Sequence, residues 1–248
     1  MSKLVVFGES FVNFLVDSTL NGKIGQVILR QSDGGFEINV LCENIINVQG
    51  LLHQKNFILW EKIGDVVIKD CMLLIKLLKG IKGNITLEII KNKLLITSDD
   101  KEIEYGIAVE EFVENNPREK VPIQFDGGFV CDKTIFKEIK QKADLLSVGK
   151  CSIAIKANVM RMTVEELEKF TVKVQVPYKD CEAEYGVWLM EISEYLEDKV
   201  TVALDNEFPI CITSKSDIMA IRYIISPIVK VEQTGQTIPA TTEKTVTK

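Results

Sequence analysis

The chain carries one sequence pattern twice, and this repeat limits the folds that it can adopt. Residues 85–109 read ITLEIIKNKLLITSDDKEIEYGIAV, and residues 200–229 read VTVALDNEFPICITSKSDIMAIRYIISPIV. Three correspondences link them: Thr86 with Thr201, Thr97 with Thr213, and Ile103-Glu104-Tyr105-Gly106-Ile107 with Ile221-Arg222-Tyr223-Ile224-Ile225. The spacing stays between 115 and 118 residues, close to half of the 248-residue chain. Such a repeat predicts two copies of one domain, each ending in a β-meander.

The composition is that of a globular protein with ample material for a core. Hydrophobic residues make up 46% of the chain and charged residues 27%. No apolar run approaches the ~20 residues that cross a bilayer, and no signal-peptide pattern is present. We therefore expect an intracellular protein, cytoplasmic in a prokaryote or nuclear in a eukaryote. The net charge of −6 argues against a generally basic nucleic-acid binder, but not against positive charge concentrated on one face.

The cysteines and the single histidine do not point to a metal or catalytic centre. Zinc ligands usually come in close pairs, whereas the six cysteines are widely spread and form no C-x-x-C pair. We therefore interpret them as buried structural thiols rather than as a metal site. His53 is more typical of a loop or surface residue than of a catalytic base. We expect no cofactor and no metal.

Enzyme motifs are also missing from the sequence. It contains no P-loop, no G-x-G-x-x-G, no G-x-S-x-G and no H-E-x-x-H. Asp33-Gly34-Gly35-Phe36 and Asp126-Gly127-Gly128-Phe129 look alike, but they occupy different places in the two copies and are best interpreted as turns. Asp99-Asp100 fits a solvated hairpin turn better than a cation site, because no calcium-loop spacing accompanies it. We therefore predict a protein that is not an enzyme.

The repeat and one abrupt change of composition set the domain boundaries. Residues 110–122 (EEFVENNPREKVP) are polar, contain two prolines and lack periodicity, which predicts an interdomain connector. The predicted domains are therefore residues 1–109 and 123–230, followed by a flexible polar tail at 231–248. Each domain shows the order strand, helix, strands, helix, strands. This order predicts an α+β fold with antiparallel sheets and two helices per domain on one face.

Capping residues and 3.6-residue periodicity predict four helices. Ser10 and Asp132 are the expected N-caps of the first and third. The predicted helices run from Ser10, from Asp65 to Ile81, from Asp132 to Leu146, and from Trp188 to Leu196. Outside the two meanders, strands are expected at residues 3–7, 26–30, 36–41, 123–130, 151–157, 159–163 and 169–176.

Lysines lie opposite the apolar faces of the second and third predicted helices. The surface that they form has two interpretations. It can be an ordinary solvated face, or it can contact phosphates, each of which adds sequence-independent, salt-sensitive binding. The lysines concerned are Lys69, Lys76, Lys79 and the following Lys82 in the first domain, and Lys133, Lys137 and Lys140 in the second.

The C-terminal block resembles the DNA sliding clamp family, the PCNA-like processivity factors of archaea, eukaryotes and some viruses. Tyr185-Gly186-Val187-Trp188-Leu189 is similar to the start of the family's closing helix, and Lys199-Val200-Thr201-Val202 with Phe208-Pro209-Ile210 to its strand pair. Residues 221–228 resemble the terminal strand, with Ser226-Pro227-Ile228 where the family has Ala-Pro, a basic residue and Ile. The two-domain plan, the helix positions and the connector extend the resemblance over residues 1–229.

The resemblance implies a flat ring, usually a trimer, with sheets outside and helices lining a hole around duplex DNA. Helix-borne positive charge would contact phosphates rather than base edges, so the clamp could slide. The resemblance implies a processivity factor that tethers DNA polymerase, the clamp loader and other enzymes carrying short docking motifs. The lysines named above would be its DNA contacts.

The family also docks its partners in a groove between the connector, the loop after the early strands and the C-terminal strand. Partners insert a short helical plug with apolar anchors into such a groove. For Leu41 and Ile46, ordinary strand-end core is an equally good interpretation. The candidate docking residues are Leu41, Ile46, Phe112, Val113, Pro227, Ile228 and Val229.

The predicted first and last helices depart from the family's basic pattern. The first offers Asn13, Asp17 and Asn21 where lysines are expected, and the last offers three glutamates before Lys199. This departure leaves room for an alternative: a checkpoint-type subunit or clamp-fold scaffold with weak or no DNA encirclement. A ring completed by other subunits would also be compatible with it.

Overall fold

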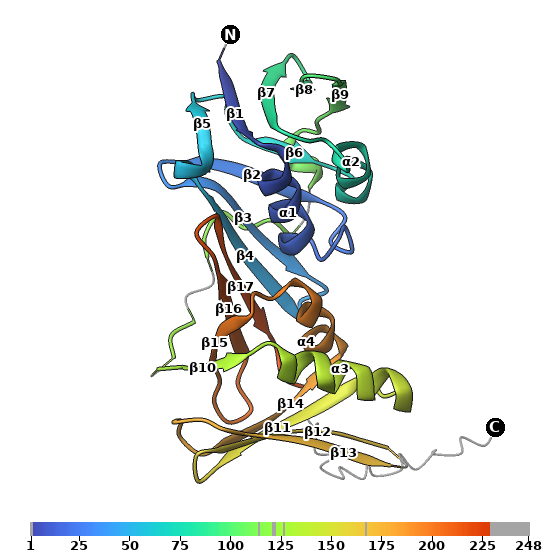
Figure 1. Cartoon of the computed structure of the whole chain (residues 1–248), viewed down its shortest axis with the longest axis vertical. Coiled ribbons are helices and arrows are strands. Elements are labelled where there is room, and N and C mark those ends of the chain that lie inside the picture. The colour runs from blue at the N-terminus through green and yellow to red at the C-terminus, as the bar shows by residue number, and fades with distance from the viewer. Residues whose placement is uncertain (1, 114, 121–122, 126, 167, 229–248) are drawn as a thin grey trace, which may run out of the picture.

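The computed structural model describes residues 2–228 apart from residues 114, 121, 122, 126 and 167. The predicted tail at 231–248 lies outside the described residues. The elongated molecule in Figure 1 contains three antiparallel sheets stacked along its long axis, with helices packed beside them.

The first half of the chain begins with a strand that leads directly into a helix. It contains β1 (Lys3–Phe7), α1 (Gly8–Ser18), β2 (Val27–Ser32), β3 (Gly35–Cys42), β4 (Ile46–His53), β5 (Phe57–Trp60), β6 (Val66–Ile68), α2 (Cys71–Leu78), β7 (Asn84–Ile90), β8 (Lys93–Thr97) and β9 (Glu102–Gly106). Short 3₁₀ turns, η1 (Gln54–Asn56) and η2 (Glu110–Phe112), precede β5 and follow β9.

The second half has the same order as the first: a strand, a helix, several strands, a second helix and three final strands. It contains β10 (Phe129–Asp132), α3 (Thr134–Leu146), β11 (Lys150–Lys156), β12 (Val159–Glu165), β13 (Lys169–Gln175), β14 (Cys181–Gly186), α4 (Val187–Glu191), the 3₁₀ turn η3 (Ile192–Tyr195), β15 (Lys199–Ala203), β16 (Ile210–Lys215) and β17 (Met219–Ile225).

Both halves close with the meander that the repeat predicts. Strands β7, β8 and β9 pair in sequence, as do β15, β16 and β17. Thr86 lies directly opposite Thr97, and Thr201 lies directly opposite Thr213, so the matched threonines are cross-strand partners in each copy. The duplication in the sequence is therefore a duplication of the fold.

One sheet joins the two halves. The eight-stranded sheet has the order β10-β15-β16-β17-β4-β3-β2-β6, and β17 pairs with β4 antiparallel from Met219↔Leu52 to Ile225↔Ile46. The first half also forms the sheet β5-β1-β7-β8-β9, and the second half forms β13-β12-β11-β14. The two halves are thus connected by a continuous backbone ladder.

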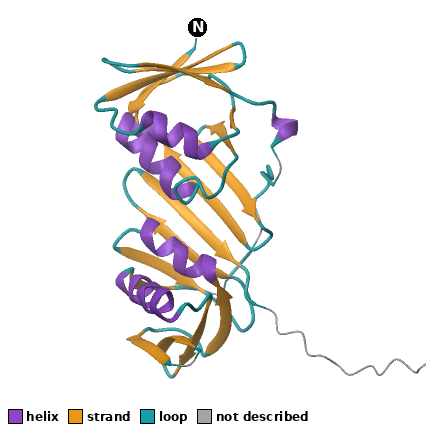
Figure 2. Ribbon diagram, turned by 90° about the vertical axis from the view of Figure 1, so that its right-hand side faces the viewer, coloured by secondary structure: helices purple, strands orange, loops and turns teal. Residues whose placement is uncertain are grey.

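The α-helices lie on one face of this central sheet, as Figure 2 shows. Helix α1 contacts α2 and β4, whereas α3 packs on β11, β12 and β13. Phe11 and Phe14 of α1, and Phe136 and Ile139 of α3, are almost completely removed from solvent. Burial of such a side chain stabilises the fold by roughly 1.5–3 kcal/mol. The α+β fold class with layered helices is confirmed.

The predicted helix over 65–81 is wrong at its N-terminal end. Val66–Ile68 is a strand paired with β2, and the helix begins only at Cys71. Asp70 caps it, since its carboxylate accepts a hydrogen bond from the amide of Leu73 at 2.8 Å. The run of β-branched residues before Asp70 completes a sheet edge instead of a helical turn.

Other predicted boundaries also shift. Helix α1 starts at Gly8, before the expected cap Ser10, because the Gly8 amide bonds to the carbonyl of Gly83 at 2.8 Å. The strand expected at 123–130 begins only at Phe129, and Phe125 instead packs edge-on against Phe208. Helix α3 begins at Thr134 with Lys133 as its N-cap, so the expected cap Asp132 lies one residue too early, although its carboxylate accepts a hydrogen bond from the amide of Thr134 at 3.0 Å.

Candidate nucleic-acid and partner-docking surfaces

The four lysines of the first half form an exposed cluster around α2. Only Lys76 lies within the helix, since Lys69 precedes the cap Asp70, Lys79 follows the last turn, and Lys82 lies in the next loop. All four are exposed, and none forms a salt bridge with a residue that the structure describes. We call Lys69, Lys76, Lys79 and Lys82 the α2 lysine cluster. Its charges are free to meet an anionic ligand.

The lysines of α3 are placed differently. Lys133 donates to Asp198 at 2.8 Å and to the carbonyl of Leu196 at 3.2 Å, with 23% of its side chain exposed. Lys140 lies 3.0 Å from Asp144 and 3.7 Å from Glu194, and is 18% exposed.

These contacts tie α3 to the segment around η3 and neutralise two of the three predicted lysines. Lys137 is exposed and makes no salt bridge within the described part of the chain. Among the three predicted α3 lysines, Lys137 therefore shares with the α2 lysine cluster both its exposure and its lack of a salt bridge to a described residue.

Carboxylates occupy the seam where α1 meets α4 and η3. Lys23, just beyond α1, forms a salt bridge with Glu191 of α4, which links the two halves. The pKa of Asp17 is raised to about 7, chiefly by burial and also by the nearby Glu197, whereas Lys133 opposes the shift. This seam is therefore less suited to an anionic ligand than the α2 lysine cluster.

The structure brings together the three parts of the predicted docking groove. The Leu41 amide donates to the carbonyl of Asn115 in the connector at 2.8 Å. The Ser226 amide, just after β17, donates to the carbonyl of Ile45 at 2.8 Å. Trp188 of α4 also donates its indole N–H to Glu43 of the same β3–β4 loop at 3.2 Å. Connector, loop and C-terminal segment are thus neighbours.

The predicted docking side chains differ in exposure. Ile46 is fully buried and Val113 is 8% exposed in a small cluster with Ile28 and Val67, so both are core residues in this conformation. Leu41 and Pro227 are half-buried, and Ile228 is 42% exposed. The side chain of Phe112 and the whole of Val229 lie outside the described residues.

Sequence reasoning missed Ile45, which is 38% exposed beside the turn at Glu43 and Asn44. Both turn residues have positive φ, at 52° and 56°. In the sequence, apolar Ile46 and Val48 alternate with polar Asn47 and Gln49, and this alternation is the signal that Ile46 faces the core.

A polar ladder holds the connector against the sheet. The buried Asn39 side chain donates to the carbonyls of Pro117 and Glu119 at 3.0 and 2.8 Å. Asn47 donates to Asn39, and Gln49 donates to Asn47, at 3.0 and 2.8 Å. Buried side-chain amides that are hydrogen-bonded in series hold one another in place, because breaking one of the bonds leaves a desolvated polar group without a partner.

Arg30 makes a second attachment of the connector. It donates to Glu110 at 3.1 Å and to the carbonyl of Asn116 at 2.9 Å. Arg118 lies 2.7 Å from the same glutamate. The described residues of the connector therefore follow a defined path along β2 and β3.

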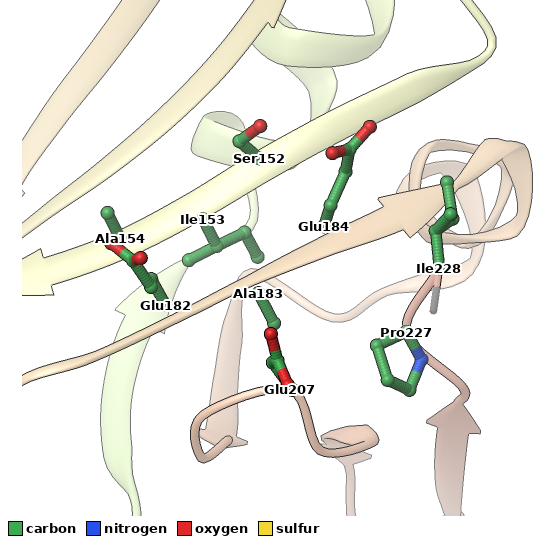
Figure 3. Close-up of a pocket in the computed structure, with 9 residues that line it drawn as sticks. All are labelled: Ser152, Ile153, Ala154, Glu182, Ala183, Glu184, Glu207, Pro227 and Ile228. Carbon is green, nitrogen blue, oxygen red and sulfur yellow. The ribbon is translucent and has the colours of Figure 1, made fainter. Parts of the chain in front are cut away.

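A cavity of about 350 Å³ lies next to the C-terminal segment (Figure 3). The segment is held on β14, because the Ile228 amide donates to the carbonyl of Glu184 at 2.7 Å and Pro227 bridges Tyr185. Two of the cavity's carboxylates have lysine partners: Glu184 with Lys150 at 3.0 Å and Glu182 with Lys156 at 3.4 Å. The lining residues are Ser152, Ile153, Ala154, Glu182, Ala183, Glu184, Glu207, Pro227 and Ile228.

The cysteines are free thiols, five of them buried and Cys42 half-buried. Burial raises the pKa of Cys71 and of Cys131 to about 12, so both stay protonated and unreactive. Within the described ranges, no group of three His, Cys, Asp or Glu side chains is placed to hold a metal ion. No described helix has the length and apolar character to cross a bilayer.

Comparisons with known proteins find relatives in structure alone. No protein-family model and no curated protein matches the sequence. The proliferating cellular nuclear antigen of Entamoeba histolytica superposes with a TM-score of 0.76 at 16% identity, over 92% of this chain and 98% of the other.

Archaeal structures are equally similar. A. fulgidus PCNA, bound to the C-terminal region of FEN-1, gives a TM-score of 0.79 at 12% identity over 94% of this chain and all of that one. The PCNA2–PCNA3 complex of Sulfolobus tokodaii gives a TM-score of 0.72 at 13% identity, over 91% of this chain and 99% of the matched chain. Similarity along nearly the full length of each chain covers both halves, the connector and the helix face. The protein therefore has the duplicated α+β fold of the PCNA-type sliding clamps.

Proposed function

We propose that the protein is a non-enzymatic sliding clamp that encircles duplex DNA as a ring and tethers DNA-processing enzymes. The observation that carries the proposal is the α2 lysine cluster, exposed and without salt bridges among the described residues, beside the helix-covered face of a PCNA-type fold. Charges placed in this way neutralise phosphates without reading bases, so the complex can slide.

The docking region supports the second part of the proposal. The connector, the β3–β4 loop and the segment after β17 are bonded to one another, and Ile45 and Ile228 expose apolar surface there. A. fulgidus PCNA is bound to the C-terminal region of FEN-1. We infer that a polymerase, a clamp loader and other partners dock here through short segments with apolar anchors.

A second candidate is a clamp-fold scaffold that holds proteins together without gripping DNA. The observation that favours it is the pairing of Lys133 and Lys140 with carboxylates, together with the acidic seam near Asp17. In that case the α2 cluster would be a solvated surface, and DNA would not be retained.

Retention on circular DNA separates the two candidates. The protein is loaded on nicked circular duplex with a clamp loader, and bound protein is measured by gel filtration before and after the circle is linearised. A sliding clamp stays on the circle, leaves the linear form, and raises polymerase processivity on a primed circle. Absence of retention and of stimulation, alone or with partner subunits, would leave the scaffold as the function.

A further inference from the structure

A second cavity, of about 520 Å³, lies between the start of α1 and the end of α2. The two helices lie side by side in the first half of the molecule (Figure 1). The lining comes from the end of β1, the first turns of α1 and the segment that joins α2 to β7. The volume lies within the range of about 300–1,000 Å³ that is typical of small-ligand sites.

Hydrogen bonds of the backbone hold the walls of this cavity. The Gly8 amide donates to the carbonyl of Gly83 at 2.8 Å, which joins the start of α1 to the segment before β7. The Ile81 amide donates to the carbonyl of Leu78 at 3.1 Å. Gly80 and Gly83 have φ of 84° and 77°, which residues with a side chain rarely adopt. The backbone therefore sets the shape of the cavity.

Apolar side chains form the inner part of the cavity. Leu78 is fully buried, Ile81 is 7% exposed, and Val12 packs against the core from α1. Phe7, at the end of β1, is 43% exposed and lies on the strand face opposite the buried Val6. A half-exposed aromatic ring beside a cavity is a surface on which another planar group can stack.

Charged side chains complete the lining. Lys79 and Lys82, two members of the α2 lysine cluster, are exposed and form no salt bridge with a described residue. Glu9, in the first turn of α1, is also exposed and likewise has no salt bridge among the described residues. The cavity thus offers two cations and one carboxylate next to an apolar floor.

This combination of groups selects one class of ligand. The two lysines favour an anion, and the ring of Phe7 favours an aromatic group. A fatty acid or a simple aryl acid would leave the Glu9 carboxylate against an apolar body that donates no hydrogen bond. A nucleotide supplies all three features: a phosphate, a planar base, and base N–H groups that a glutamate can accept from.

The base must be free of other stacking partners. A base inside a duplex has both faces covered by its neighbours and its pairing edge occupied, so it cannot lie on Phe7. An unpaired nucleotide of a DNA strand leaves the face and the edge of its base available, and so does a free nucleotide. These two sources share one chemistry.

We propose that the cavity between α1 and α2 binds a nucleotide whose base is unstacked. The base lies on Phe7 and donates to Glu9, and the phosphate lies at Lys79 and Lys82. This site goes beyond the proposed function, because sliding along a duplex requires phosphate contacts alone.

Fluorescence anisotropy of the full chain with short labelled DNA strands tests the site. An abasic strand of the same length supplies the phosphates without the bases, and dCMP supplies the nucleotide without the strand. The strand with bases should bind about tenfold more tightly than the abasic strand, because one base stacks on an aromatic ring. Phenyl phosphate has the ring and the anion but no N–H group, so it should compete severalfold less well than dCMP.

Substitution of Phe7 identifies the surface on which the base stacks. Phe7→Leu keeps an apolar side chain but removes the ring, so the preference for bases should fall below about twofold while binding of the abasic strand is unchanged. Phe7→Trp should keep the preference. Phe208→Leu alters another exposed phenylalanine, 40% exposed, and is the matched control. Circular dichroism verifies that each variant is folded.

The outcomes separate the two sources of the ligand. A preference for bases that depends on Phe7 supports an unpaired nucleotide of a strand. Binding of dCMP that depends on Phe7, without a preference between strands, supports a free nucleotide. Equal binding of both strands together with no binding of dCMP overturns the inference, and so does a preference that Phe7→Leu leaves intact.

Retention on circular duplex is measured separately with the same preparations. A chain that shows the Phe7-dependent preference but is not retained on circles contradicts the clamp function and supports this inference. A chain that is retained on circles but shows neither the preference nor dCMP binding contradicts this inference and leaves the clamp function standing.

Discussion

Lysines in this molecule have different roles according to the side chains around them. Lys76 and Lys79 project into solvent, whereas Lys133 and Lys140 are largely covered and bound to carboxylates of their own chain. The helical spacing of the α3 lysines is visible in the sequence. The carboxylates that bind them are only partly visible, because Glu194 and Asp198 lie more than fifty residues away. Sequence spacing alone therefore could not separate the two groups.

Substitution should separate the two roles. Lys76→Glu with Lys79→Glu should leave stability unchanged and weaken DNA retention, with the slope of log K against log salt reduced by about 2. Lys133→Ala should instead lower the free energy of unfolding by about 1 kcal/mol, because it breaks a hydrogen bond and an ion pair. Retention at several salt concentrations and urea unfolding measure the two effects. Equal loss of retention in both variants would contradict the assignment.

Asp17 should make stability depend on pH. Its pKa is about 7 in the folded protein, against an ordinary value of 3.8. Between these values the folded state binds more protons, so this carboxyl lowers stability progressively as pH rises from about 4 to about 7.

Asp17→Asn should therefore raise the free energy of unfolding by about 1–2 kcal/mol at pH 8, with allowance for solvent screening, and change it little at pH 4. Urea unfolding at both pH values is the measurement. Asp217→Asn, in an exposed hairpin, serves as the control. The same gain at pH 4 and pH 8 would show that burial of the Asp17 charge is not the cause.

At the scale of elements, the sequence predicts the existence of helices and strands better than their ends. The two meanders were predictable because apolar alternation and turn residues coincide. The start of the second helix was not predictable in this way. Val66–Ile68 fits the apolar periodicity of α2, but these residues form a strand that pairs with β2. Phe125 likewise appears in a strand-like run, yet its ring packs against Phe208 from a loop. In both segments, tertiary contacts rather than the local sequence pattern determine the backbone conformation.

The connector offers a test at this scale. Asn39→Ala removes two hydrogen bonds to the connector and should lower the free energy of unfolding by about 2 kcal/mol. It should also loosen the backbone around Arg118 and Lys120, which are already exposed, so that trypsin cleaves the connector faster. Asn13→Ala, on the exposed side of α1, is the matched control. Lower stability with unchanged cleavage would mean that other contacts, such as Arg30 with Glu110, hold the connector.

At the scale of the whole molecule, the repeat predicted the architecture, and three-dimensional proximity determined the site. The predicted docking segments do meet, but Ile46 and Val113 belong to the core, while Ile45 is exposed. The alternation along β4 indicates the inward position of Ile46, whereas no periodicity in the connector indicates that Val113 packs with Ile28 and Val67. The uneven charge of the helix face also depends on contacts between the two halves, such as Lys23 with Glu191.

The continuous ladder between β17 and β4 has a mechanical consequence. Seven consecutive residue pairs cross from one half to the other, so bending the molecule at its middle would break a row of main-chain bonds in a packed sheet. The molecule is therefore stiff at its middle. If the proposed ring forms, we expect it to open at a joint between neighbouring molecules, because no covalent backbone spans such a joint.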